Sequence, residues 1–546
     1  MCVYDPVDNG KTISVDGEDG EDGAVGKGLR YGYFLAKITT IDEHDARRIG
    51  RKHGFEVQRK LQSYDDVYIG KREIRRRRKR GIEDEIVEEM MLSQQVKFIE
   101  KLNNFRRYTR AAIEFKNKPV HVWKLEPSMK IEEAWKSGYN GANVTIAIID
   151  DGVDVEHVDL RNQFSPHVSF DFVRFGTLPI PKNRKDFQHG TQCAGLVSME
   201  GNQCGLGVGH GAVLGGIRLL SNDMLNDALE GDALAFQRNK IDIYSVSWGP
   251  KDDGITAEMP QSFTSSAIRQ GVLEGRNGKG NIYVWASGNG GMNGDNCALD
   301  GYVSNENTIS FGVIGSDGQP AKYAEGCSAV LAAVSGGDSM IQTTGLGSTC
   351  SAISGSSASA AIAAGIIGLT LQANPSLTQR DIQHLIIKSS NIESIKNLKL
   401  TENAAGFKFH PKVGFGLLDA EKLVNMAKEW KNVGEQLVCE VSKVPTSIVD
   451  FTSCSQISAI EKVIIDATIH HVHRGMVRFE VESPQGTRSE VLPLRKNDKT
   501  ADLIKWAFVS THYYGERPMG MWKLHIISEE DIKFHVDIHN IKITGI

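Results

Sequence analysis

Residues 144–149 (VTIAII) form an apolar run that lacks the alternation of polar and apolar residues typical of a half-exposed strand. Such a run indicates a strand buried on both faces, as in the parallel sheet of an α/β protein. Asp150, Asp151 and Gly152 follow it directly. Because open α/β sheets carry their functional groups at the carboxyl ends of strands, we expect Asp150 to lie where a site forms.

Two later stretches carry side chains that complement Asp150. His189 opens a stretch of small residues, and residues 355–360 (GSSASA) place Ser357 before an uncharged run to Thr370, which we interpret as a buried helix. A serine hydroxyl needs a base to take its proton, and a histidine serves when a carboxylate fixes its tautomer. The positive end of the helix favours negative charge developing on a substrate. Each motif alone is usually structural, but together they predict a nucleophilic serine site.

The order Asp, His, Ser along the chain is that of the subtilisin type of site. Chymotrypsin-like enzymes have the order His, Asp, Ser, and α/β-hydrolases need a Gly-x-Ser-x-Gly elbow, which Ser357 lacks. A second buried strand is predicted at residues 281–287, followed by Gly288 and Asn289. Alone, Asn289 would be an ordinary turn residue. Beside the other three motifs, we predict that its amide donates to an oxyanion.

The chain resembles the kexin/furin-type proprotein convertases, a calcium-dependent branch of the subtilisin-like serine endoproteases. The resemblance covers residues 31–546 and is most specific in five motifs: residues 149–160 (IDDGVDVEHVDL), 189–195 (HGTQCAG), 245–254 (SVSWGPKDDG), 283–291 (YVWASGNGG) and 355–365 (GSSASAAIAAG). It implies a catalytic triad with an oxyanion-hole residue, namely Asp150, His189, Ser357 and Asn289.

The family cleaves after paired basic residues, which acidic side chains in its cleft recognise. This agrees with the physics, because a desolvated guanidinium must be paired and carboxylates pair with it bidentately. For each acid, the alternative is a solvated surface charge. The matching positions are Asp252 and Asp300 for the P1 residue, Asp151 and Asp186 for P2, and Glu230, Glu258 and Tyr302 for P4, with Trp248 also expected at the substrate.

The resemblance also implies Ca²⁺ beside the P1 pocket. The matching ligands are Asp252, Asp295 and Glu325, and carboxylates are hard oxygen ligands of the kind that Ca²⁺ prefers. Asp159 matches a ligand of a second calcium site of the family. There the acid expected before Trp123 is missing, so we expect this second site to be eroded.

The cysteines bear on the compartment. None of the eight shows Cys-x-x-Cys spacing. The resemblance leaves Cys193 as a buried thiol and implies three disulfides, Cys204–Cys350, Cys297–Cys327 and Cys439–Cys454. Disulfides imply an oxidising compartment, so we expect the secretory pathway. Residues 1–30 are acidic and glycine-rich and lack the features of a signal peptide, which we interpret as an incomplete N-terminus.

We expect an α/β subtilisin-like catalytic domain with a parallel sheet, preceded by a small α+β pro-segment and followed by an all-β P domain. The expected boundaries are an acidic N-terminus at 1–30, the pro-segment at 31–110, the catalytic domain at 111–431 and the P domain at 432–546. Within the pro-segment the patterns predict a strand at 31–38 and helices at 45–55 and 82–105.

Basic motifs mark candidate cleavage sites in the N-terminal region. Arg107-Tyr108-Thr109-Arg110 suits acidic P4 and P1 pockets and is the predicted end of an inhibitory pro-segment. Lys71-Arg72 matches the internal cut of the family. The basic run at 75–80 offers another exposed cut, although in isolation it would be a nucleic-acid patch or a linker.

The predicted function is a calcium-dependent, monomeric serine endoprotease that processes precursor proteins or prohormones after paired basic residues and is made as an autoprocessed zymogen. A net charge of −5 argues against a nucleic-acid partner, and no run of 18 apolar residues predicts a transmembrane anchor, so a secreted or granule-stored enzyme is expected. One alternative is a convertase fold kept as a non-enzymatic binding module, which the intact catalytic residues disfavour. The other is a cytosolic subtilisin-like peptidase, favoured by the missing signal alone.

Overall fold

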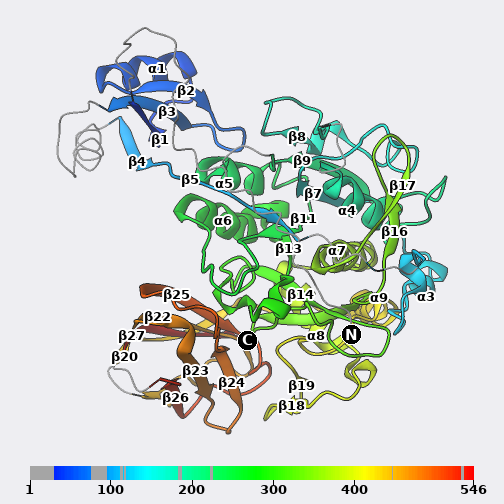
Figure 1. Cartoon of the computed structure of the whole chain (residues 1–546), viewed down its shortest axis with the longest axis vertical. Coiled ribbons are helices and arrows are strands. Elements are labelled where there is room, and N and C mark those ends of the chain that lie inside the picture. The colour runs from blue at the N-terminus through cyan, green and yellow to red at the C-terminus, as the bar shows by residue number, and fades with distance from the viewer. Residues whose placement is uncertain are drawn as a thin grey trace, which may run out of the picture.

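The computed structural model describes residues 30–74, 95–110, 115, 118–182, 187–221, 225–444, 447–530 and 534–546. It has an N-terminal lobe (residues 30–110), a central domain (118–430) and a C-terminal β domain (437–546), with the central domain between the other two (Figure 1). Several predictions lie outside the described residues: the acidic N-terminus up to residue 29, the basic run at 75–80, the first part of the predicted 82–105 helix, and Asp186.

Within its described residues, the N-terminal lobe contains a four-stranded antiparallel sheet and the helix α1. The strand order is β2-β3-β1-β4, formed by β1 (Arg30–Ile38), β2 (Glu56–Lys60), β3 (Val67–Ile74) and β4 (Val96–Lys101). Helix α1 (Glu43–Lys52) begins at Asp42, whose side chain accepts the Asp45 N–H, and buries Ile49 in a small core with Phe34. The predicted strand at 31–38 is confirmed, and the helix predicted at 45–55 begins and ends earlier.

The helix predicted over residues 82–105 is wrong where the structure describes that segment. Residues Val96–Lys101 form β4, and Asn104–Phe105 form the short strand β5. The mixed charge and spacing resemble a helical pattern, but β4 pairs with the edge of β1, and β5 pairs with β10 (Leu225–Asn226) of the central domain. Tertiary pairing therefore overrides the local pattern.

The central domain is built on a seven-stranded sheet whose neighbours are all parallel, which confirms the predicted α/β class. The order is β15-β14-β13-β11-β7-β9-β8. The strands are β7 (Thr145–Asp150), β8 (Phe170–Asp171), β9 (Val213–Arg218), β11 (Ile243–Val246), β13 (Ile282–Ala286), β14 (Thr308–Ile314) and β15 (Val330–Ser335).

Helices cover both faces of this sheet (Figure 1). In β7, Ile146 and Ile148 belong to one hydrophobic core and Ala147 and Ile149 to another, as expected of a strand buried on both sides. The first core contains α4 (His189–Ser198), α7 (Ser356–Ala373), α8 (Gln379–Ser389), α9 (Ala420–Glu429) and the short α3 (Ile131–Lys136). On the opposite side lie α5 (Asp227–Ala235) and α6 (Ser262–Gly278).

Helix α7 runs through the middle of the first core. By length and composition it could span a membrane, but 89% of it is buried inside the fold. Its run of alanines and glycines lets neighbouring elements approach closely, since a Cβ at Gly365 would meet the Val208 side chain at 2.6 Å. This confirms the predicted buried helix, which begins one residue before Ser357.

Short paired strands complete the central domain and its contacts with the lobe. They are β6 (Tyr108–Thr109), β12 (Trp248–Gly249), β16 (Ile341–Thr344), β17 (Cys350–Ile353), β18 (Thr401–Glu402) and β19 (Lys408–Phe409). Two disulfides staple this domain, Cys204–Cys350 and Cys297–Cys327, and Cys193 is a buried free thiol. The predicted pairing is confirmed.

The C-terminal β domain consists of two four-stranded antiparallel sheets with the orders β20-β27-β22-β25 and β21-β26-β23-β24, as predicted for an all-β domain. The third predicted disulfide, Cys439–Cys454, is present here. The strands are β20 (Leu437–Val444), β21 (Ile448–Asp450), β22 (Ile460–His471), β23 (Val477–Glu482), β24 (Arg488–Leu492), β25 (Asp502–Ser510), β26 (Met521–Ser528) and β27 (His535–Gly545).

Candidate active site

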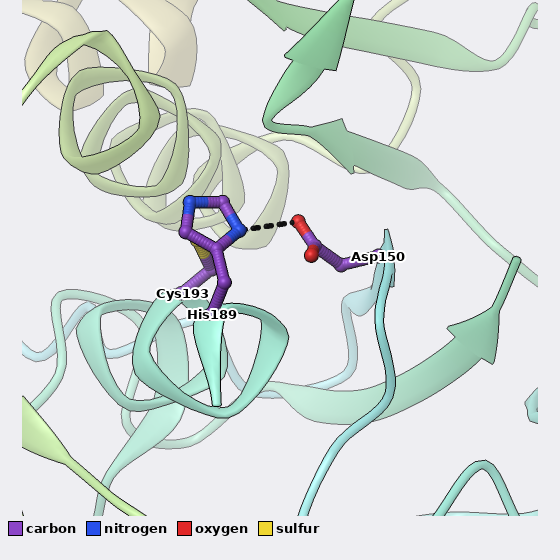
Figure 2. A group of neighbouring side chains, drawn as sticks. All are labelled: Asp150, His189 and Cys193. Carbon is purple, nitrogen blue, oxygen red and sulfur yellow. Dashed lines mark hydrogen bonds and ion pairs between the residues drawn. The ribbon is translucent and has the colours of Figure 1, made fainter. Parts of the chain in front are cut away.

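Three buried side chains from three elements meet at the carboxyl end of the sheet. Asp150 ends β7, His189 begins α4, and Ser357 lies in the first turn of α7. His189 Nδ1 donates to Asp150 Oδ2 at 2.9 Å, and its Nε2 lies 3.0 Å from Ser357 Oγ (Figure 2 shows the Asp150–His189 contact). A carboxylate cannot donate, so the neutral ring carries its proton on Nδ1 and leaves Nε2 free to accept the serine proton.

The electrostatics of His189 suit a general base. Burial opposes the charged imidazolium, but the charge and hydrogen bond of Asp150, together with the charge of Asp151, outweigh burial and raise the pKa of His189. The Ser357 hydroxyl is also 3.2 Å from the carbonyl oxygen of Ser247, which gives it a second acceptor in the resting site. An imidazolium formed during proton transfer would therefore be stabilised by its carboxylate partner.

Cys193 lies one turn after His189 on α4, close to the ring (Figure 2). Its sulfur and the ligand atoms of Asp150 and His189 lie within 4.8 Å of one another. Burial raises the pKa of the Cys193 thiol well above its usual value, so the sulfur stays protonated and is a poor metal ligand. We interpret Cys193 as a packing residue of α4.

Asp151, predicted for substrate recognition, has a structural contact that the sequence did not reveal. Its carboxylate accepts the backbone N–H groups of His189 (3.1 Å) and Gly190 (2.8 Å), so it fixes the start of α4. Burial and the neighbouring Asp150 raise the pKa of Asp151. Gly190 is required by close packing, because a Cβ there would lie 2.3 Å from the Gly152 carbonyl oxygen.

Asn289 follows β13, and its amide points at a carbonyl group of the N-terminal segment. Nδ2 donates to the carbonyl oxygen of Arg110 at 2.7 Å, and Oδ1 accepts the Ser356 N–H at 2.9 Å. The second bond orients the amide so that its donor faces the carbonyl. Gly355 has φ +90°, and a Cβ there would press on both the Arg110 oxygen and the Asn289 amide.

The side chain of Arg110 fills the predicted P1 pocket. Its guanidinium donates to the Asp300 carboxylate and to the carbonyl oxygen of Ala286, and its Nε lies 3.4 Å from Asp252 Oδ1. Burial by itself would lower the pKa of Arg110, but Asp300 and Asp252 reverse the effect and raise it. The wall of the pocket is Gly249, where a Cβ would lie 2.3 Å from the guanidinium.

The side chain of Arg107 fills the predicted P4 pocket. It contacts Glu230 (3.0 Å), Glu258 (3.1 Å) and the hydroxyl oxygen of Tyr302 (2.6 Å). Trp248, by contrast, meets the segment through its backbone, in the antiparallel pair β6–β12. Its side chain is buried, and its indole N–H donates to the Ile149 carbonyl oxygen at 2.8 Å.

The three predicted calcium ligands lie around the turn after β13. Glu325 accepts the Gly290 N–H at 2.8 Å, and Asp252 accepts the Asn289 N–H at 2.8 Å. A Cβ on Gly290 would fall within 2.9 Å of both Asp295 and Glu325, so glycine leaves the space in which these carboxylates converge. Burial, followed by the charges of Asp252 and Asp295, raises the pKa of Glu325 well above its usual value. A buried cluster of hard oxygen ligands with excess negative charge fits Ca²⁺.

Asp159 is held by the backbone of a neighbouring loop. Its carboxylate accepts backbone N–H groups from Gln203 (3.0 Å) and Cys204 (2.7 Å), and its role as a ligand of a second calcium site stays a prediction. The predicted internal cut at Lys71-Arg72 lies within β3, which is paired on both sides by β1 and β2. Cleavage there would therefore require local opening of the sheet.

An Asp–His–Ser triad with an asparagine amide on a parallel sheet defines a subtilisin-like serine peptidase. Comparisons agree: residues 141–416 match the subtilase family and residues 460–544 match the proprotein convertase P-domain. The chain belongs to the kexin/furin-type proprotein convertases and is a serine endopeptidase.

Individual relatives support this assignment. The chain is 66% identical to endoprotease aex-5 of Caenorhabditis elegans, over 94% of this chain and 95% of that protein. It is 35% identical to neuroendocrine convertase 2 of Bos taurus, over 90% of this chain and 85% of that one. The fold is similar to the solved structure of a serine protease of Aeromonas sobria, with a TM-score of 0.67 and 19% identity over 80% of this chain and 98% of that one.

Proposed function

We propose that this convertase is a calcium-dependent endoprotease of the secretory pathway, which cleaves precursor proteins or prohormones after Arg-x-x-Arg and Lys-Arg sequences. One observation carries the proposal. The chain's own Arg107 and Arg110 occupy two acidic pockets while the Arg110 carbonyl oxygen accepts from Asn289. A guanidinium desolvated in this way is costly unless it is paired, so the pockets select basic residues over neutral ones.

The chemistry follows from the contacts. His189 Nε2 takes the proton of Ser357 Oγ as the oxygen attacks the carbonyl carbon of the P1 residue. The Asn289 amide donates to the oxygen as it becomes negative, and the imidazolium then gives its proton to the leaving amine. Water, activated by the same histidine, releases the acyl group from Ser357. Asp150 holds the ring throughout by its bond to Nδ1.

We further propose that the N-terminal lobe is a pro-segment that inhibits the enzyme as a bound product and is released by autoprocessing after Arg110. Its last residues run antiparallel to the central domain in two short strand pairs, β5–β10 and β6–β12. Away from the cleft, Asp232 of α5 accepts the N–H groups of Gln62 and Ser63, both at 2.7 Å. These contacts hold the segment in place in the precursor.

Calcium would be held by Asp252, Asp295 and Glu325. When bound, the ion supplies positive charge that offsets three converging carboxylates. Asp252 also contacts the Arg110 guanidinium, so its position affects the P1 pocket. Arg495 of the C-terminal β domain is buried and pairs with the Asp295 carboxylate at 2.9 Å.

The decisive experiment is a P1 scan on Arg-x-Lys-X peptides with purified mature enzyme. We expect cleavage with Arg or Lys at P1 and little with Leu, because a neutral side chain leaves Asp300 and Asp252 buried without a partner. Asp300→Asn should weaken this preference. Equal rates for Arg and Leu in the wild type would overturn the basic specificity.

The metal is tested by exhaustive chelation. Activity should be lost and restored by Ca²⁺ but not by Mg²⁺, which tolerates irregular carboxylate sites poorly. The thermal unfolding midpoint should fall with chelation and recover in parallel, giving a readout independent of turnover. Full activity and an unchanged midpoint after chelation would remove calcium from the proposal.

The compartment is tested by maleimide labelling of the denatured protein purified from its source. Three intact disulfides leave about two reactive thiols, whereas a reduced cytosolic protein offers about eight. The second outcome would favour the cytosolic alternative.

A further inference from the structure

The segment that enters the cleft is buried at one position that the basic specificity does not explain. Among residues 103–110, the side chains shielded from solvent are those of Phe105, Arg107 and Arg110. Phe105 is 9% exposed and belongs to the hydrophobic core of the central domain. Counted back from Arg110 as P1, it is the P6 residue.

A backbone pairing holds Phe105 against the central domain. Strand β5 pairs antiparallel with β10, and Phe105 lies directly opposite Leu225, which is also buried. Side chains alternate along an extended chain, so Phe105 and Arg107 face the same side while Arg106 between them is exposed. Directly opposed apolar side chains in an antiparallel pair contact each other.

The wall that meets Phe105 is continuous with the acid that meets Arg107. Strand β10 leads directly into α5, where Asn226 caps the helix by accepting the Leu229 N–H at 3.1 Å. Glu230, the partner of Arg107, lies in the first turn of that helix. A P6 contact and a P4 contact are therefore carried by one continuous piece of chain, β10 and the first turn of α5.

The phenyl ring also contacts the P4 side chain itself. Arg107 Cζ lies 4.1 Å from the ring centroid of Phe105 and 5.0 Å from that of Tyr302, so its guanidinium lies over both aromatic rings. Such contacts stabilise a cation, most of all where water is excluded. A basic side chain at P6 would instead place a like charge beside Arg107.

We infer that the cleft contains a subsite for the P6 residue that takes an aromatic side chain. Leu225 forms one part of this subsite, and the P4 arginine seated in its acidic pocket forms the other, so P6 and P4 are recognised together. The inference rests on the proposed basic specificity and narrows it, because preferred substrates then have the form aromatic-x-Arg-x-x-Arg. An aromatic side chain at P6 packs on the P4 guanidinium and leaves Glu230 and Glu258 to pair with it. A basic side chain at P6 would compete with the P4 arginine for these carboxylates.

The test is a cycle of four peptides of equal length with Arg at P1, combining Phe or Ala at P6 with Arg or Ala at P4. With Arg at P4, Phe at P6 should raise kcat/KM about tenfold over Ala. With Ala at P4 the gain should fall to about threefold, since burial remains but the cation contact is gone. A fifth peptide, with Lys at P6 and Arg at P4, should be cleaved no faster than its counterpart with Ala at P6.

Enzyme variants locate the subsite. Leu225→Ala and Leu225→Asp should both reduce the Phe-to-Ala ratio at P6, and a ratio within one variant is insensitive to partial loss of folded enzyme. The matched control is Leu273→Asp, at a leucine of α6 that is 61% exposed, which should keep the wild-type ratio.

The outcomes separate the two proposals. If no peptide with Arg at P4 and P1 is cleaved, the proposed function fails. If these peptides are cleaved but Phe and Ala at P6 give equal kcat/KM, the basic specificity stands and the P6 subsite is overturned. An unchanged ratio in both Leu225 variants removes Leu225 from it.

Discussion

The central domain meets its two neighbours in different ways. The N-terminal lobe has a small core of its own, and it reaches the central domain through two-residue strand pairs, buried charges and a small apolar cluster in which Leu35, Leu61 and Leu102 meet Ala228 of α5. The C-terminal β domain shares one continuous hydrophobic core with the central domain, in which Trp285 and Trp506 are both members. Separating the first interface would expose only the small apolar cluster and Phe105, whereas separating the second would expose a large shared core to water.

The polar contacts repeat this contrast. At the lobe, acids of the central domain pair with Arg107 and Arg110, which belong to the segment that we propose is released after cleavage. At the C-terminal β domain, Glu461 of β22 joins His384 (2.7 Å) and Arg380 (2.6 Å) of α8, and Lys542 meets Glu306 at 2.7 Å. We infer that the first interface is temporary and the second permanent.

The largest effect is expected from Ser357→Ala. Loss of the nucleophile should reduce hydrolysis about 10⁴-fold or more. Because the lobe could no longer be cut away, this variant should purify with residues 30–110 still attached and the C-terminal β domain unaffected. The measurement is N-terminal sequencing together with peptide hydrolysis, and a mature start at Ala111 in this variant would contradict autoprocessing.

Arg110→Ala tests the same interface from the other side. With the P1 guanidinium removed, Asp300 and Asp252 lose their partner in the lobe, so we expect an uncleaved and inactive precursor. Mass spectrometry of the secreted protein checks this. Arg106→Ala is a matched control, because Arg106 is exposed in the same segment and its loss should leave processing intact.

Asn289→Ala should reduce kcat by about 10²–10³-fold and leave KM nearly unchanged, because the amide stabilises charge that appears in the transition state. Processing of the lobe should slow by a similar factor, since the same amide contacts the Arg110 carbonyl oxygen. Steady-state kinetics separate the two parameters. A rise in KM without a fall in kcat would show a binding role instead.

The permanent interface should weaken with acid. Burial alone would raise the pKa of Glu461, but hydrogen bonds from His384, Arg380 and Gln436 hold it at about 2. The pKa of Glu461 is lower in the folded protein than its unfolded value of about 4.5. The contact therefore contributes its full stabilisation to the fold above about pH 4.5, and this stabilisation is lost as the pH falls toward about 2.

We therefore expect wild type to lose about 3 kcal/mol of unfolding free energy across this pH window that Glu461→Gln does not lose. Urea unfolding of the mature enzyme at several pH values measures the difference. Glu402→Gln, at an exposed glutamate, is the control and should follow the wild type. Parallel pH profiles for wild type and Glu461→Gln would contradict the assignment.

The smallest effect is expected at Lys251, beside the P1 pocket. Its side chain is 60% exposed and pairs with Asp253 at 3.6 Å, so solvent screens its charge from Arg110. Lys251→Glu should raise kcat/KM for P1 Arg peptides by about threefold or less, and the gain should shrink as salt rises. A tenfold gain that persists at high salt would show that Lys251 acts inside the pocket.

Local patterns in the sequence determined the central elements. The unbroken apolar run before Asp150 predicted a buried strand, and the uncharged run after Ser357 predicted a buried helix. Both predictions were possible because an element buried on all sides contains few polar residues. The resemblance to a family added the disulfide pairs and the acids of the pockets, which no local pattern could identify.

The tertiary structure decided what depends on partners distant in the chain. Residues 96–101 became a strand because β1 offered an open edge, and Asp159 is oriented by the amides of residues 203–204, which turn toward it. The same holds for Arg495, which reaches Asp295, and for Phe105, which meets Leu225. These contacts join residues far apart in sequence, and the free energy of each depends on burial and geometry that a single sequence does not encode locally.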